Sequence, residues 1–199
     1  MNLIFVHIQK TGGSSIAATI GQKVYSPHKH RFASELKVIH GAAAWDDAYK
    51  FAFVRNPWDR LVSWWAMIEQ FRPHHEQGRD LNRFFKYVHS RARTFEEFIV
   101  NCPDDIEDDN GKKCILRNQI DYTVDENGAS MVDFIGKFEN LHQDFNHVLR
   151  AVGREPRPLP HHNKTPHRPY QEYYSARTRA IIEEAYAKDI AAFGYRFDG

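Results

Sequence analysis

A short apolar run that leads directly into a glycine pair and a helix is the feature that constrains this chain most. Residues 2–8 (NLIFVHI) are almost entirely apolar, which is typical of a strand buried on both faces of a parallel sheet. Gly12 and Gly13 follow, and they allow a tight turn and a close approach of the backbone to a ligand. Residues 14–22 are predicted to form a helix that starts near Ser14. This order predicts an α/β fold with an anion site at the turn.

The turn itself (QKTGGSS, residues 9–15) carries groups that bind anions. The backbone amides of residues 11–16 can point inward at the helix start, where the partial positive charge lies. Lys10 adds a full positive charge. Hydroxyl donors are supplied by Thr11, Ser14 and Ser15. The pattern is not the GxxxxGK[ST] phosphate loop, because the lysine precedes the glycines. A glycine-rich turn without a ligand is the alternative for this segment.

A second candidate site lies around the sequence FVRNPWDRLVSWW. Residues 50–56 (KFAFVRN) predict a strand with Arg55 at its carboxyl end, the edge where open α/β sheets bind ligands. Pro57 suits the first turn of the helix predicted over residues 58–71. Ser63 lies about two turns into that helix. An arginine and a serine placed in this way can hold a phosphate group together.

The rest of the chain alternates between short strands and helices. We expect a strand over residues 37–41 (KVIHG) and helices over residues 80–100, with Thr94 as an N-cap. A strand and a helix are expected from residue 132 to about Val152. A long helix is expected over residues 175–193, with an N-cap at Ser175 and a stop at Gly194. Residues 101–113 are expected to form an acidic surface loop, and residues 153–169 a Pro-rich extended connection. This alternation predicts one domain over residues 1–199, a three-layer α/β fold with a central parallel sheet flanked by helices.

The composition excludes several classes of protein. Lys and Arg number 27 against 26 Asp and Glu, and a net charge of +1 argues against general nucleic-acid binding. A chain that is 42% hydrophobic is not an acidic disordered segment. No run approaches the roughly 20 apolar residues that span a membrane, and the first run is too short for a signal peptide, so a cytoplasmic location is expected.

The cysteines, histidines and acidic residues predict neither a disulfide framework nor a metal site. Two cysteines are too few for a disulfide-dense scaffold. Cys102 and Cys114 are expected to be thiols in the cytoplasm, and an oxidised pair would require export. No Cys/His spacing matches a zinc site, and the acidic residues 104–111 lack the spacing of a calcium loop, so no metal is expected.

Two segments together resemble the sulfotransferases that use 3′-phosphoadenosine 5′-phosphosulfate, above all the carbohydrate sulfotransferases with heparan 2-O-sulfotransferase-like and related bacterial enzymes. FVHIQKTGGSSI is similar to the family pattern hIPKTGGTS, with Gln9 in place of the proline and Ser14 in place of the threonine. FAFVRNPWDRLVSWW is similar to hRNPhxRhhSxY, with matches at Arg55, Asn56, Pro57, Arg60 and Ser63. Weaker matches are RNQIDY, VDFIGKFENLHQDF, LPHHNKT and DIAAFGYRF, so the resemblance covers most of the chain.

The resemblance implies a P-loop-like fold, a co-substrate and its binding residues. The 5′-phosphosulfate would be held by Lys10, Thr11, Gly12, Gly13, Ser14 and Ser15. The 3′-phosphate would be held by Arg55 and Ser63, and Lys164 and Arg168 lie where relatives cover the nucleotide. The acceptor would be a hydroxyl group, with a sugar hydroxyl favoured over a lipid, a small metabolite or a peptide tyrosine.

Sulfuryl transfer also needs a cation at the leaving oxygen and a base at the attacking hydroxyl. Lys10 can supply the cation. The glycan-acting relatives have a His-Gly-His run that this chain matches only as His40, Gly41 and Ala42. The base is therefore His40 or a residue elsewhere. Gln119 and Tyr122 line the acceptor cleft or belong to the core or a loop.

Two other functions compete with sulfuryl transfer. One is a nucleotide-dependent kinase with a variant phosphate loop, which the missing GK[ST] and the lack of a Mg²⁺-binding carboxylate cluster argue against. The other is a catalytically silent nucleotide-binding module, which Ala42 leaves open. The sequence sets no oligomeric state.

Overall fold

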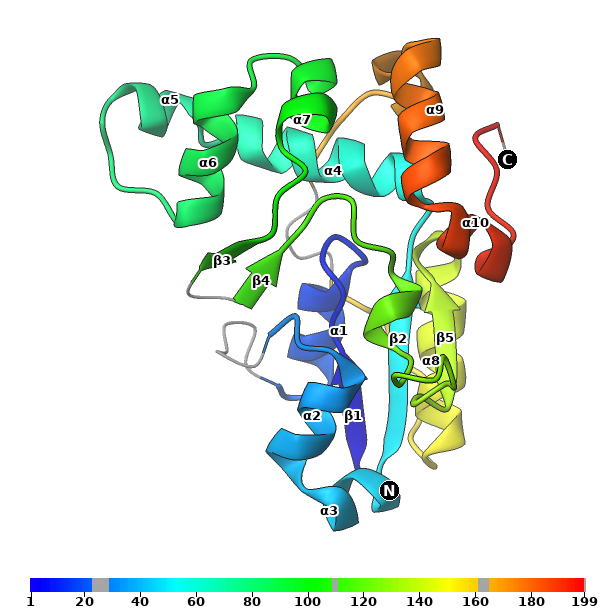
Figure 1. Cartoon of the computed structure of the whole chain (residues 1–199). Helices are drawn as coiled ribbons and strands as arrows, with labels where there is room; N and C mark the ends of the chain where they lie inside the picture. Colours follow the sequence, from blue (N-terminus) through cyan, green and yellow to red (C-terminus); the bar gives the residue numbers. More distant parts are fainter. Residues whose placement is uncertain (23–28, 109–110, 161–164, 199) are drawn as a thin grey trace. The chain divides into compact units, whose positions relative to one another are not determined.

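The computed structural model describes residues 1–22, 29–108, 111–160 and 165–198 (Figure 1). The chain divides into two compact units. The first unit comprises Met1–Arg55 and Gln119–Lys164, and the second comprises Asn56–Asn118 and Thr165–Gly199. Each unit is described by itself below. Within the described residues, no helix is both long and apolar enough to cross a membrane.

A three-stranded parallel sheet is the centre of the first unit. It contains β1 (Leu3–Val6), β2 (Tyr49–Val54) and β5 (Phe134–Lys137), in the order β1-β2-β5. The pairing is in register, with Phe5 opposite Phe51 and Ala52 opposite Ile135. All three strands fall where the sequence predicts them. Their carboxyl ends lie at the same edge, so the segments that follow β1 and β2 start side by side (Figure 1).

Aromatic side chains on one face of this sheet build the core of the first unit. Phe5, Phe51 and Phe53 point to the same face because alternate residues of a strand share a face. Helix α1 (Gly13–Thr19) and helix α8 (Leu141–Ala151) cover this face. The side chains that complete the cluster are Ile16, Phe145, Val148, Leu149 and Leu159. Burial of each large apolar side chain stabilises the fold by roughly 1.5–3 kcal/mol. This arrangement confirms the α/β class with a parallel sheet flanked by helices.

The strand expected over residues 37–41 is wrong. The segment forms helix α2 (Ala33–His40), and Gly41 with a φ of 81° connects it to helix α3 (Ala42–Asp47). Ala33 and Leu36 are buried at helical spacing, whereas Val38 is 83% exposed. The Glu35 carboxylate accepts a hydrogen bond from the Phe32 amide (2.8 Å) and so stabilises the first turn. The β-branched pair Val38–Ile39 misleads because helical packing overrides its strand preference.

Short 3₁₀ segments complete the first unit. Segment η1 (Ile120–Tyr122) precedes β5, and η2 (Phe138–Asn140) links β5 to α8. Strand β5 and helix α8 confirm the strand and helix expected from residue 132 to about Val152.

The second unit is mostly helical. Its elements are α4 (Pro57–Glu69), α5 (Arg72–Glu76), α6 (Arg83–Arg91), α7 (Phe95–Asn101), β3 (Ile106–Asp108), β4 (Gly111–Lys113), η3 (Tyr170–Tyr173), α9 (Ala176–Ala185) and α10 (Ala187–Phe193). Asn56 caps α4 by accepting hydrogen bonds from the amides of Trp58 and Asp59. The predicted helix over 58–71 and the Thr94 cap of α7 are confirmed.

Two segments of the second unit differ from the sequence expectations. The acidic residues 101–113 include the antiparallel strands β3 and β4 in place of a plain loop. The long helix expected over 175–193 begins at the Ser175 cap and stops at Gly194 (φ 68°), but it is divided at Tyr186. The Tyr186 hydroxyl accepts from Arg60 Nη1 (2.9 Å) and donates to the Ile115 carbonyl. These buried bonds fix the Tyr186 side chain at the junction of α9 and α10.

Candidate functional site

The loop that joins β1 to α1 accepts only glycine at two positions. Gly12 has a φ of 81°, and a Cβ there would lie 2.8 Å from Leu141 Cδ2. A Cβ on Gly13 would lie 2.1 Å from His7 Nε2, because the imidazole packs directly against this backbone. Lys10 also has a positive φ of 66°, although it is not glycine. The loop is therefore a tightly packed structure with a strained residue in its middle.

The structure brings Lys10 and Arg55 together at the carboxyl edge of the sheet. Arg55 Nη1 donates a hydrogen bond to the Lys10 carbonyl (3.2 Å), and the guanidinium lies over the Phe138 ring (4.1 Å). Burial, together with the nearby charges of Arg55 and Lys29, lowers the pKa of Lys10 to about 8. Two further cations from separate segments, Arg55 and Lys29, thus lie near the loop residue Lys10.

The hydroxyl groups of the loop do not all face the same way. The Thr11 side chain is buried, and its Oγ1 donates to the Ile8 carbonyl (3.0 Å). This bond braces the turn from within, so the side chain of Thr11 is directed toward the protein. Ser14 is half-buried, and Ser15 is buried. Of the three hydroxyls expected to face an anion, that of Ser14 is the most accessible.

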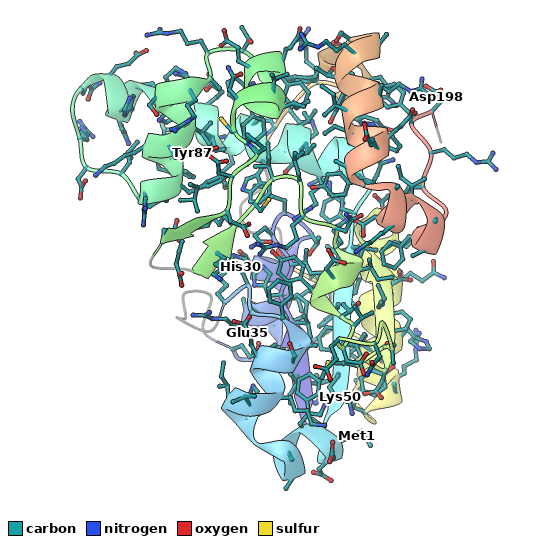
Figure 2. The ribbon with its side chains drawn as sticks, in the orientation of Figure 1. Met1, His30, Glu35, Lys50, Tyr87 and Asp198 are labelled. Atoms are coloured by element: carbon teal, nitrogen blue, oxygen red, sulfur yellow. The ribbon has the colours of Figure 1, made fainter. Side chains whose placement is uncertain are left out.

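A histidine pair that was not predicted from the sequence, His7 and His30, lies against the same loop. His30 Nδ1 lies 2.9 Å from the His7 carbonyl, and the two imidazole rings are 4.5 Å apart (His30 is labelled in Figure 2). Burial and the neighbouring charges of His30 and Lys29 hold the pKa of His7 well below its usual range. The one sequence signal for this pair is the H-x-H spacing of residues 28–30, which repeats the spacing of the family run.

Gln119 and Tyr122 are buried and hydrogen-bonded, which decides between the alternatives for these residues. Gln119 Oε1 accepts from the Arg55 amide (2.9 Å), and its Nε2 donates to the Arg55 carbonyl (2.8 Å). The Tyr122 hydroxyl donates to Gln9 Oε1 (2.9 Å), and the Tyr122 ring stacks on Phe32 at 4.7 Å. Both residues belong to the core and do not line a cleft.

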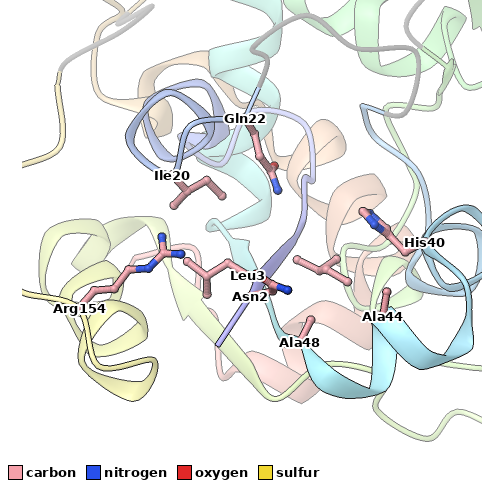
Figure 3. Close-up of a pocket in the computed structure, with 9 residues that line it drawn as sticks. Asn2, Leu3, Ile20, Gln22, His40, Ala44, Ala48 and Arg154 are labelled. Carbon is pink, nitrogen blue, oxygen red and sulfur yellow. The ribbon is translucent and has the colours of Figure 1, made fainter.

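His40 lies at the other end of β1, which removes the ground for its assignment as the base. It lines a cavity of about 300 Å³ with Asn2, Leu3 and Arg154 (Figure 3). Asn2 and Leu3 stand where β1 begins, whereas the Lys10 loop follows the point where β1 ends. The assignment depended on a strand over 37–41, and this segment is a helix.

The remaining candidate residues belong to the second unit or lie outside the described residues. Ser63 is buried on α4. Arg168 is exposed, pairs with Glu172 (3.2 Å) and lies over the Tyr173 ring (5.2 Å). Lys164 falls outside the described residues.

The comparisons with known proteins give one match. A model of the sulfotransferase family matches residues 1–196. No curated protein and no solved structure gives a significant match.

Proposed function

The chain belongs to the sulfotransferase family, and from this membership we propose that it transfers a sulfuryl group from 3′-phosphoadenosine 5′-phosphosulfate to an acceptor hydroxyl. The observation that carries the proposal is the pairing of Lys10 with Arg55. Two cations meet beside a glycine turn, at the edge of a parallel sheet where ligands bind. A co-substrate with a phosphosulfate and a separate phosphate requires cationic groups of this kind.

The co-substrate contacts divide between the loop and the residues after β2. Lys10 and the backbone of Gly12, Gly13 and Ser14 would hold the 5′-phosphosulfate, and Arg55 would hold the 3′-phosphate. The Thr11 hydroxyl is bonded to Ile8, so the proposal assigns its backbone rather than its side chain to the ligand. From the sequence resemblance we also propose that the same nucleotide contacts Ser15, Ser63, Lys164 and Arg168.

The titration of Lys10 suits the chemistry at the leaving oxygen. A pKa of about 8 keeps most of the lysine protonated at pH 7 and makes it a stronger acid than an ordinary lysine. The acceptor oxygen forms a bond to sulfur while the bond from sulfur to the phosphate oxygen breaks. Lys10 stabilises the charge on that oxygen or gives it a proton, and the products are a sulfate ester and adenosine 3′,5′-bisphosphate.

We assign the general base to His30 in place of His40. A carbonyl oxygen only accepts hydrogen bonds, so the contact with the His7 carbonyl fixes the proton of His30 on Nδ1. In the neutral imidazole Nε2 then has the lone pair that a base needs. Within the described residues, Lys10 and His30 are the two non-glycine residues with a positive φ. Backbone strain of this kind is concentrated at functional sites.

The acceptor class rests on the sequence resemblance, which favours a sugar hydroxyl. A kinase with a variant loop and a silent binding module are the competing functions. The test incubates the protein with the ³⁵S-labelled co-substrate and a panel of sugars, phenols and lipids, and follows labelled products by mass spectrometry and autoradiography. We expect label on a sugar hydroxyl. Transfer of the γ-phosphate of ATP, with no sulfuryl transfer to any acceptor, would overturn the proposal.

A further inference from the structure

We propose that Gln119 and Tyr122 are positioning residues that set the spacing between Arg55 and Lys10, the two cations of the co-substrate site. The four residues belong to the first unit, and the hydrogen bond by which Tyr122 contacts Gln9, the neighbour of Lys10, spans 113 positions of sequence. The inference rests on the proposed function for the meaning of that spacing. The clamp, defined as Gln119 and Tyr122, touches neither the co-substrate nor the reacting atoms.

Gln119 takes the place of a strand neighbour at Arg55. The pairing of β2 with β5 ends at Val54, so the ladder does not reach the backbone of Arg55. Buried backbone groups need partners, and the Gln119 amide supplies one acceptor and one donor at 2.9 and 2.8 Å. Both hydrogen bonds require the amide group, because a carboxylate accepts but does not donate. The position of Arg55 is therefore fixed by a side chain 64 residues away.

Tyr122 positions Lys10, the second cation, through Gln9, the residue that precedes Lys10. Gln9 stands next to Lys10 and is 3% exposed, and its Oε1 accepts the Tyr122 hydroxyl (2.9 Å). The ring of Tyr122 is packed against Phe32 and fully buried, which leaves little freedom for the hydroxyl. The bond therefore fixes the start of the loop in which Lys10 has its strained conformation.

One short hydrogen-bonded turn connects Gln119 to Tyr122. The Tyr122 amide donates to the Gln119 carbonyl (3.2 Å), and Thr123 Oγ1 donates to the Ile120 carbonyl (2.8 Å). The 3₁₀ segment η1 therefore links the Gln119 contacts with Arg55 to the Tyr122 contact with Gln9. Together with the bond from Arg55 to the Lys10 carbonyl, these contacts form a closed circuit through both cations.

A fixed spacing matters because the co-substrate has two anionic groups at a set separation. A misplacement of about 1 Å can cost on the order of 100-fold in a positioned reaction. The clamp therefore acts on ligands that need both cations more than on ligands that need one. Core packing alone makes no such distinction, because general loosening weakens both kinds of ligand alike.

The test uses variants that remove one hydrogen bond and keep the packing. Tyr122→Phe removes the hydroxyl and keeps the ring on Phe32, and Gln9→Met removes its acceptor from the other side. Tyr87→Phe is the matched control, because the Tyr87 hydroxyl donates to Asp104 (3.0 Å) within the second unit (labelled in Figure 2). Calorimetry then compares the affinity for adenosine 3′,5′-bisphosphate with the affinity for adenosine 5′-monophosphate.

We expect Tyr122→Phe and Gln9→Met each to weaken the bisphosphate about tenfold, the size of one lost hydrogen bond, and the monophosphate less than threefold. The double variant adds little to either single change, because both remove the same bond. Tyr87→Phe leaves the ratio of the two affinities unchanged. An equal effect of Tyr122→Phe on both nucleotides would overturn the clamp.

A second measurement does not need a nucleotide. The titration of Lys10, followed by NMR of ¹³C-labelled lysine, depends first on the burial of this lysine and then on the nearby charge of Arg55, and both lower its pKa. In Tyr122→Phe we expect the pKa to rise from about 8 toward that of an ordinary lysine. If the wild type binds neither nucleotide, the proposed function fails, and this titration alone decides the clamp. A titration identical to the wild type would then refute it.

Discussion

The two ends of strand β1 both carry a histidine and a basic side chain, but only one end has the features of a reaction site. At the carboxyl end, Arg55 is buried, Lys10 is half-buried, the Arg55 guanidinium donates to the Lys10 carbonyl, and two residues have strained backbones. At the amino end, His40 and Arg154 line an exposed cavity of about 300 Å³. Constrained polar groups, and not an open cavity, therefore mark the candidate site.

The largest expected difference between the two ends concerns their histidines. His30→Ala should lower kcat by about 10²–10⁴-fold, because the proposed base for the hydroxyl proton is lost. His40→Ala should leave kcat within twofold of the wild type. Steady-state transfer from the labelled co-substrate measures both. A loss confined to His40→Ala would move the site to the amino end.

The basic side chains give the next comparison. Lys10→Ala should lower kcat by about 10²–10³-fold, because a cation at the leaving oxygen is removed. Arg154→Ala, at the amino end, should change kcat by less than twofold. The same transfer assay measures both, and equal effects of the two variants would contradict the distinction.

Substitution of a glycine should reduce the free energy of unfolding more at the carboxyl end of β1 than at the amino end. Gly13→Ala places a methyl group on the His7 ring and should cost about 3 kcal/mol of unfolding free energy. Gly153→Ala meets no atom within 4 Å, and its positive φ should cost about 1 kcal/mol. Urea unfolding measures both. If Gly13→Ala is no more costly than Gly153→Ala, the close packing of His7 on the loop is wrong.

The smallest expected effect is a pH dependence that belongs to the carboxyl end. In the proposed mechanism protonated Lys10 is the active form, and its pKa is about 8, so kcat/KM should fall above that pH by about tenfold per pH unit. In Lys10→Arg the decline should disappear below pH 10, because arginine keeps its proton there. The profile is measured at subsaturating co-substrate. If kcat/KM declines in the same way in Lys10→Arg, the decline reports the titration of another group.

Local sequence signals were sufficient to predict the central strands of the fold and the proximity of Lys10 and Arg55 in the candidate site. Strands β1 and β2 and helix α4 follow from apolar runs, the glycine pair and Pro57. The meeting of Lys10 and Arg55 follows because both stand at the carboxyl ends of neighbouring parallel strands. These features need only residues that are close in sequence, together with one rule about sheet edges.

The features that sequence reasoning missed depend on contacts between distant segments. Helix α2 forms because Ala33 and Leu36 are buried by the rest of the unit, which outweighs the β-branched pair that follows. The tautomer of His30 is set by a carbonyl 23 residues away, and Gln119 acts on Arg55 across 64 residues. No local sequence pattern indicates which distant residues form these hydrogen bonds.

The most direct test of the central claim is a calorimetric titration with adenosine 3′,5′-bisphosphate, the product of the proposed reaction. The wild type and Arg154→Ala should bind it with equal affinity, and Lys10→Ala should bind it at least tenfold more weakly, because a charged contact is lost. Undiminished binding by Lys10→Ala, together with loss of binding in Arg154→Ala, would contradict the account and place the nucleotide at the amino end of β1.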